Sequence, residues 1–200
     1  MLNQELLEVG LFFHGHKCPA MPMGLKCGVA AMDALGVERA KDGQLMALIE
    51  IDEQHCATCW ADGVMVSTGC TLGKGNIQKL GYGKWALTLI DKKSGKAVRV
   101  SPKAEAMAQN KKSEFFDYRK KGIPASQVPA EVAEPLFQRV VNAPAEMLLN
   151  IGQVFDYKWT DAPHTFESSV CPECGEMTVE RNMRVKGGVN VCLPCSGYAK

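Results

Sequence analysis

Four cysteines near the C-terminus restrict the fold of that region more than any other feature of the sequence. They form two C-x2-C pairs, Cys171 with Cys174 and Cys192 with Cys195, on either side of residues 175–191. A hairpin between the pairs can bring the four thiolates together around a tetrahedral Zn2+. Because so short a segment cannot build its own core, the metal would hold it folded. We predict a structural zinc site here; a rubredoxin-like iron site and a dithiol redox pair are the alternatives.

The cysteine count and the charge limit the compartment and the partners. Nine cysteines is an odd number, unlike a secreted disulfide framework. The N-terminus, MLNQELLEVGLFF, lacks the basic start and cleavage site of a signal peptide. We therefore expect a cytoplasmic protein whose thiols are metal ligands or redox groups. A net charge of +1 makes a nucleic-acid partner unattractive, and no apolar run is long enough for a membrane span.

Two stretches with a high density of soft ligands predict a second site. They are HGHKC at 14–18 and HCATCWADGVMVSTGCTLGKGN at 55–76. Imidazole and thiolate ligands suit zinc, iron or another thiophilic metal. We expect the two stretches to fold together, and the possible core metal site then consists of His14, His16, Cys18, Cys59 and Cys70.

The same residues also allow thiol chemistry without a metal. Cys18 precedes a predicted helix, whose N-terminus favours the thiolate, and a histidine can activate Cys18 or Cys59 as a nucleophile or redox thiol. Asp62 follows Cys59 by one helical turn and shares its face. The candidate catalytic residues are therefore Cys59, His16, Cys18 and Asp62. Cys27 is most simply a packing residue, and Cys56 could be the same.

The glycine-rich segment 68–76 is expected to be a loop. It is a poor match to a phosphate-binding P-loop, because Gly69 and Gly73 are one residue too close and no Ser or Thr follows Lys74. It is either a tight turn that needs positive φ angles or a place where backbone approaches a ligand. On the second interpretation the cofactor-binding residues are Gly69, Thr71, Lys74 and Asn76.

Hydrophobic periodicity predicts alternating helices and strands. The first helix ends near Gly10 or Phe13 and the second covers about 22–35. Further along, we expect a strand at 44–51, a helix at 57–67, a hairpin of 84–90 with 96–101, a helix at 102–121, helical pieces at 135–142 and 144–150, and a strand at 153–159. Basic residues cluster on the helix at 102–121. A solvated face explains them most simply, and anion binding is the alternative.

These expectations divide the chain into three parts. Residues 1–122 form an α+β core, 123–165 a proline-punctuated helical connector arm, and 166–200 the four-cysteine zinc module.

The motifs at 14–24 and 59–77 resemble the FmdE family of formylmethanofuran dehydrogenase proteins. The family pattern is H-G-H-x-C-P-G followed by C-x-x-D-A-I-Q-x-x-T-G-C-T-x-G-K-x-N. Ala20, Gly63, Val64 and Met65 depart from it. Among the matching positions are His14, His16, Cys18, Cys59, Asp62, Cys70, Lys74 and Asn76.

The resemblance implies a fold and a set of partners. The fold would be an α+β core with a mixed or antiparallel sheet, similar to the catalytic half of glyceraldehyde-3-phosphate dehydrogenase, with a zinc-ribbon-like tail. It implies a homodimer and association with a larger molybdenum or tungsten oxidoreductase.

Three functions remain open from the sequence. The first is an accessory or redox subunit of one-carbon metabolism that uses the core site, with a possible second metal ion, for an unidentified small molecule. The second is a non-catalytic metal-handling or molybdoenzyme-maturation factor. The third is a zinc-ribbon regulator that binds nucleic acid, which the near-neutral charge disfavours.

Overall fold

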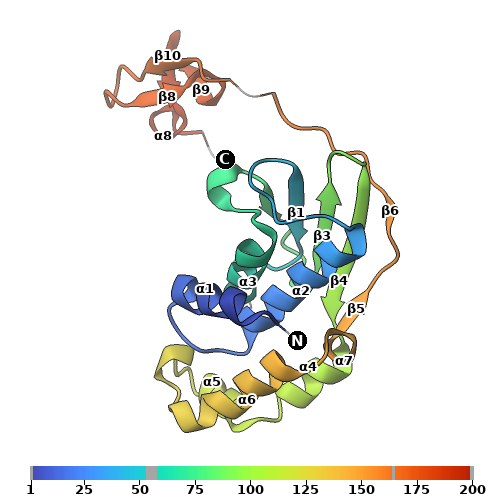
Figure 1. Ribbon diagram of the computed structural model, residues 1–200. Coiled ribbons are helices and arrows are strands. Elements are labelled where there is room, and N and C mark those ends of the chain that lie inside the picture. The colour runs from blue at the N-terminus through green and yellow to red at the C-terminus, as the bar shows by residue number, and fades with distance from the viewer. Residues whose placement is uncertain (1, 53–57, 164, 199–200) are drawn as a thin grey trace. The chain divides into compact units, whose positions relative to one another are not determined.

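The computed structural model describes residues 2–52, 58–163 and 165–198 of the chain (Figure 1). The chain folds into two compact units, Met1–Trp159 and Thr160–Lys200. Most of the segment predicted as a separate connector arm, 123–165, therefore belongs to the first unit. Its helix α6 (Ala130–Asn142) buries Leu136, Phe137 and Val140 in the main core, which explains why it does not stand apart.

The first unit contains a six-stranded mixed sheet, which confirms the predicted α+β class with a mixed or antiparallel sheet. The order is β2-β1-β3-β4-β5. The C-terminal part of β4 pairs with β5, and its N-terminal part pairs with β6. Only β1 and β2 are parallel; the other pairs are antiparallel. The strands are β1 (Leu45–Ile49), β2 (Ile77–Lys79), β3 (Leu87–Asp91), β4 (Lys96–Pro102), β5 (Leu149–Ile151) and β6 (Phe155–Asp156).

Side-chain alternation gives the sheet two different faces. Leu45, Ala47 and Ile49 of β1 join the main core, whereas Met46 and Leu48 join a smaller cluster with Tyr157 and Trp159. Successive side chains of a strand point to opposite faces, so both faces of β1 are covered. This explains why every residue of the predicted strand at 44–51 that lies in β1 is buried.

Three helices form the layer that carries the N-terminal motifs: α1 (Gln4–His14), α2 (Ala20–Leu35) and α3 (Thr58–Thr68) (Figure 1). Helices α2 and α3 pack closely because glycines face each other at their crossing. A Cβ at Gly24 would lie 2.0 Å from the carbonyl oxygen of Trp60, and a Cβ at Gly63 would lie 2.1 Å from that of Met21. This close approach brings the first turns of both helices together.

Two helical predictions after the hairpin need correction. The expected single helix at 102–121 is two helices, α4 (Ala104–Asn110) and α5 (Glu114–Lys120). The backbone N–H and the hydroxyl of Ser113 both donate to the carbonyl of Asn110, which closes a turn between them. The helical piece predicted at 135–142 begins earlier, because α6 starts at Ala130 and continues through Pro135. Burial of its apolar face outweighs the one hydrogen bond that the proline removes.

The remaining elements of the first unit are short. They are η1 (Leu72–Lys74), η2 (Ala125–Gln127) and α7 (Ala145–Leu148). The hairpin of β3 and β4 is confirmed, although β3 begins three residues later than the predicted start at residue 84. The predicted strand at 153–159 is reduced to the two residues of β6, and β2 was not predicted.

The second unit consists of two small hairpins and a terminal helical turn. Strand β7 (Ser168–Val170) pairs with β8 (Met177–Val179), and β9 (Met183–Lys186) pairs with β10 (Val189–Cys192). The turn η3 (Glu180–Asn182) separates β8 from β9, and α8 (Leu193–Ser196) follows β10. Gly187 and Gly188 form the turn between β9 and β10, with φ angles of 59° and 82°, a conformation that favours glycine.

Across the ranges that the structure describes, no helix combines the length and the apolar character needed to cross a membrane.

Candidate functional site

The two C-x2-C pairs come together in the second unit as predicted. One sulfur from each of Cys171, Cys174, Cys192 and Cys195 lies within 4.8 Å of the others. The sulfurs of Cys174 and Cys192 are 3.8 Å apart. The backbone N–H of Cys192 donates to the sulfur of Cys171 at 3.3 Å. This hydrogen bond and one from the backbone N–H of Cys174 lower the pKa of Cys171 to about 6. Contacts among the four sulfurs raise the pKa values of Cys174 and Cys195, because one thiolate is easier to form there than several. The fit to a tetrahedral metal ion therefore rests on the four convergent sulfurs.

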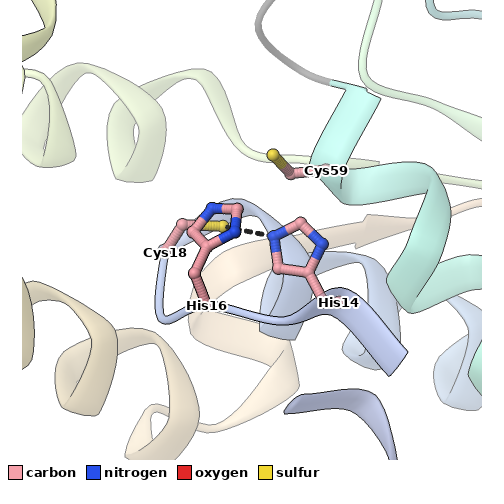
Figure 2. A group of neighbouring side chains, drawn as sticks. All are labelled: His14, His16, Cys18 and Cys59. Carbon is pink, nitrogen blue, oxygen red and sulfur yellow. Dashed lines mark hydrogen bonds between the residues drawn. The ribbon is translucent and has the colours of Figure 1, made fainter. Parts of the chain in front are cut away.

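A second ligand cluster lies where α1, α2 and α3 meet. His14 is the last residue of α1, and Gly15, with a φ of 83°, reverses the chain after it. His16 and Cys18 lie in the short segment before α2, and Cys59 lies in the first turn of α3. Figure 2 shows the four side chains pointing toward one another from these three elements. One ligand atom from each lies within 4.8 Å of the others.

Asp62 fixes the orientation of His14. Its Oδ2 lies 2.7 Å from Nδ1 of His14, whose side chain is 4% exposed. The opposite ring nitrogen, Nε2, lies 3.3 Å from the sulfur of Cys18 and therefore faces the cluster. A carboxylate behind a ligating histidine is the usual arrangement in protein metal sites, where it fixes the tautomer and raises the basicity of the ligand.

His16 contributes an atom that lacks a partner. Its Nε2 is buried and has no hydrogen-bond partner among the described residues. The His16 ring lies beside the His14 ring, with centroids 4.1 Å apart. A buried nitrogen without a partner is unfavourable, and a metal ion at the cluster would satisfy it. The donor set of two imidazoles and two sulfurs thus fits a thiophilic metal ion in both chemistry and placement.

The side chains of the cluster shift one another's pKa values in opposite directions. Hydrogen bonds from Cys18 and His14 lower the pKa of Cys59 to about 4. Burial lowers the pKa of His14, but the hydrogen bonds to Asp62 and Cys59 outweigh burial and raise it to about 9. The contact with Cys59 and burial raise the pKa of Cys18, whereas burial and the charge of His14 lower the pKa of His16. The favoured state at neutral pH is a Cys59 thiolate beside a His14 imidazolium.

Cys70 does not join the core cluster, although we predicted from the sequence that it belongs to the core metal site. It lies after the C-terminal end of α3 and is fully buried, and its backbone N–H donates to the hydroxyl of Thr68. Burial raises the pKa of its thiol, so it is not poised as a thiolate. The helix explains the separation, because Cys59 and Cys70 lie near opposite ends of α3. His55 and Cys56 lie outside the described residues.

The glycine-rich loop is shaped by contacts within the chain. Asn76 accepts from the backbone of Thr71 and donates to the carbonyls of Asp42 and Leu45. The ammonium of Lys74 donates to the carbonyl of Ala40 at 3.2 Å. Gly69 has a φ of 70°, and a Cβ there would lie 2.3 Å from the carbonyl oxygen of Ala40. These contacts account for the loop as a turn; cofactor binding by Gly69, Thr71, Lys74 and Asn76 stays a prediction.

A groove of about 530 Å³ lies beside the core cluster, between α3 and the β2 edge of the sheet. Its walls are mainly apolar. Asp62, which contacts His14, also lines the groove. The volume is within the range of small-molecule sites. A ligand in this groove would therefore lie next to the carboxylate that orients His14.

Comparisons with known proteins agree with the geometry. A family model described as "FmdE, Molybdenum formylmethanofuran dehydrogenase operon" matches residues 13–150, which include all four core ligands but not the four C-terminal cysteines. A protein of Archaeoglobus fulgidus, named a probable S-adenosyl-L-methionine-binding protein, is 35% identical over 195 residues. The match covers 92% of this chain and 50% of the relative, so the chain spans about half the length of that protein.

A solved structure shows a similar fold. The crystal structure of a tungsten formylmethanofuran dehydrogenase FmdE-like protein from Syntrophus aciditrophicus matches with a TM-score of 0.60 and 23% sequence identity. The match covers 97% of this chain and 91% of that one. At this identity the comparison concerns the fold.

Proposed function

This chain belongs to the FmdE family, and from that membership and the ligand geometry we propose a metal-binding accessory or redox subunit. It would act with a molybdenum or tungsten formylmethanofuran dehydrogenase or with a related enzyme of one-carbon metabolism. The observation that carries the proposal is the convergence of His14, His16, Cys18 and Cys59 within 4.8 Å.

The residues of the core cluster would divide the work between holding a metal and controlling access to it. His14, His16 and Cys18 supply buried or half-buried ligand atoms, and Asp62 holds His14 with Nε2 facing inward. Cys59 is half-buried and lies at the start of α3, where the helix N-terminus favours its thiolate. A metal ion held there would supply Lewis-acid or redox chemistry, according to its identity. The neighbouring groove gives a small molecule room to approach this side.

We propose that the four cysteines of the second unit bind a structural Zn2+. The set of four sulfurs is complete, which is typical of structural rather than catalytic zinc sites. The only buried hydrophobic residues in the described part of this unit are Cys171, Val191 and Cys192, so its own core is very small. Metal binding would therefore supply most of its folding free energy.

We further propose a homodimer, with the larger oxidoreductase as the second partner. Large apolar side chains on the surface of the first unit support an interface with another protein. Phe12 on α1 is 92% exposed, and Phe13 beside it is 56% exposed. A monomer that keeps such side chains in water gains nothing from them, whereas burial in an interface is favourable.

A metal-handling or maturation factor is the alternative that the same geometry allows. The two roles differ in how firmly the core ion is held. A metal-delivery protein exchanges its ion with a competing chelator while it stays folded, whereas a resident centre does not. Binding of nucleic acid is the least favoured role, because the chain has a net charge of only +1.

The name of the Archaeoglobus fulgidus protein adds S-adenosyl-L-methionine as a candidate ligand. The groove beside Asp62 has mainly apolar walls with one carboxylate and one ammonium group, that of Lys79, and these suit the cationic and carboxylate groups of this compound. Calorimetric titration of the full chain with S-adenosyl-L-methionine tests this ligand directly. Absence of binding would remove S-adenosyl-L-methionine as a ligand of this chain.

The metal content of anaerobically purified protein tests the proposal. We expect two metal ions per chain in the wild type and one in the double variant Cys18→Ser/Cys59→Ser. The double variant Cys171→Ser/Cys174→Ser should lose the other ion. Cys70→Ala is the matched control, because it removes a buried thiol outside the cluster and should keep both ions. A core double variant with the same metal content as the wild type would overturn the proposed core centre.

A further inference from the structure

A basic pocket with aromatic walls lies between the sheet and the helices α4 and α5. Its volume is about 740 Å³, well within the range of small-molecule sites. Three parts of the chain line it: the segment before β3, the end of β4, and α4 with α5. None of the core ligands and none of the residues of the groove beside Asp62 belongs to it.

The turn between α4 and α5 creates this pocket. In a continuous helix at 102–121, Lys111 and Arg119 would lie about 12 Å apart along the axis. Because the chain turns at Ser113, Lys111 at the end of α4 and Arg119 on α5 line the same hollow. The hollow also includes Trp85, in the segment before β3, and Arg99 of β4.

The pocket has an excess of positive charge. Five basic residues line it and no acidic residue does. Two of the five are paired: Arg99 donates twice to the buried carboxylate of Glu50, at 2.6 and 2.9 Å, and Lys120 lies 2.9 Å from Asp117. Arg99 chiefly, and the charge of Lys84 to a smaller extent, lower the pKa of Glu50, whereas Lys111 is exposed at the end of α4. Arg119 donates to the carbonyl of Ile123, which leaves its charge uncompensated.

The apolar part of the pocket is suited to a planar ring. Trp85, Met107 and Phe116 are half-buried, so each keeps a surface open to the hollow. Aromatic side chains gain free energy when a flat ring packs against them, and a neighbouring cation adds to the attraction. Lys84 precedes β3 and Arg99 lies in β4, so a solvated face of one helix does not account for the basic residues that converge on this wall.

We propose that this pocket binds a small anion that joins a planar ring to a phosphate group, the chemistry of a nucleoside monophosphate. The phosphate would be held by Lys84, Lys111 and Arg119, and the ring would pack against Trp85 and Phe116. Charge-assisted hydrogen bonds to phosphate are the strongest that these side chains can make. The site is separate in its residues from the metal centre and does not depend on it.

Calorimetric titration of the metal-loaded full chain tests the proposal with four probes. Adenosine 5′-monophosphate combines both features, phenyl phosphate replaces the nucleoside by a plain ring, adenosine lacks the charge, and inorganic phosphate lacks the ring. We expect adenosine 5′-monophosphate to bind about tenfold or more tightly than adenosine or inorganic phosphate. Equal binding of phenyl phosphate would identify an aromatic phosphate in general, and weaker binding would identify a nucleotide.

Variants assign the binding to this pocket. Lys84→Gln/Lys111→Gln should weaken adenosine 5′-monophosphate binding by about tenfold or more. The control Lys41→Gln/Lys93→Gln removes the same charge from exposed positions outside the pocket. Trp85→Leu should weaken binding of the two ring-bearing phosphates and leave inorganic phosphate unchanged. The proposal is overturned if the two double variants lose equal affinity, if inorganic phosphate binds as tightly as the nucleotide, or if no ring-bearing phosphate binds the wild type.

Discussion

Replacement of Asp62 by alanine should change the pH dependence of metal binding at the core cluster. In the wild type, Asp62 holds Nδ1 of His14 at 2.7 Å and contributes to a His14 pKa of about 9. A metal ion at Nε2 must displace the proton that His14 carries below this pKa. At pH 7 that displacement opposes metal binding by about 2.7 kcal/mol, at about 1.36 kcal/mol per pH unit.

The substitution has two opposite effects. It removes the carboxylate that orients His14, and loss of such a partner weakens metal binding about 10–100-fold, or about 1.4–2.7 kcal/mol. It also lowers the pKa of His14, so less free energy is needed to remove the proton at pH 7. At pH 7 the two effects oppose each other. Above pH 9 His14 is already neutral in the wild type, and only the loss remains.

The ratio of the metal dissociation constants, Asp62→Ala over wild type, should therefore rise with pH. We expect a ratio of about 10–100 above pH 9 and a smaller ratio at pH 7. Competition with a chromophoric zinc chelator, on full chain whose C-terminal site is already loaded, measures both constants. Asp33→Ala is the control, because Asp33 is an exposed carboxylate near the opposite end of α2 from Cys18. A ratio that does not change with pH would show that Nε2 of His14 is not a ligand.

Two further predictions concern the stability of the first unit. Phe137 is 1% exposed in the main core. Its replacement by alanine should lower the free energy of unfolding by about 3–5 kcal/mol, as measured by urea denaturation. A loss below about 1 kcal/mol would contradict its assigned packing. The hydrogen bonds from Arg99 hold the pKa of Glu50 below its ordinary value, so their stabilisation is present above that value and is lost as the pH falls through the folded-state pKa. The Glu50→Gln variant should be less stable than the wild type at neutral pH, and the gap should narrow in acid; a constant gap from pH 7 to pH 3 would refute the pairing.

Local patterns in the sequence were sufficient for the elements whose side chains alternate or recur regularly. The hairpin of β3 and β4, the strand β1 and the helices α1 to α3 lie where periodicity places them. The misplaced elements depend on distant contacts. Pro135 is tolerated inside α6 because that helix buries Phe137, and β2 exists because its three residues pair with β1. Neither contact is visible within a short window of sequence.

The sequence by itself indicated most of the side chains of both clusters, because residue type and spacing decide which side chains can bind a metal. Cys171, Cys174, Cys192 and Cys195 form a closed set within one short segment, and His14, His16 and Cys18 are neighbours in the chain. Only the tertiary structure decided that Cys59 joins the core cluster and Cys70 does not, since the length of α3 separates them. The basic pocket likewise depends on the fold, because β4, α4 and α5 approach one another only when the sheet and the helices pack.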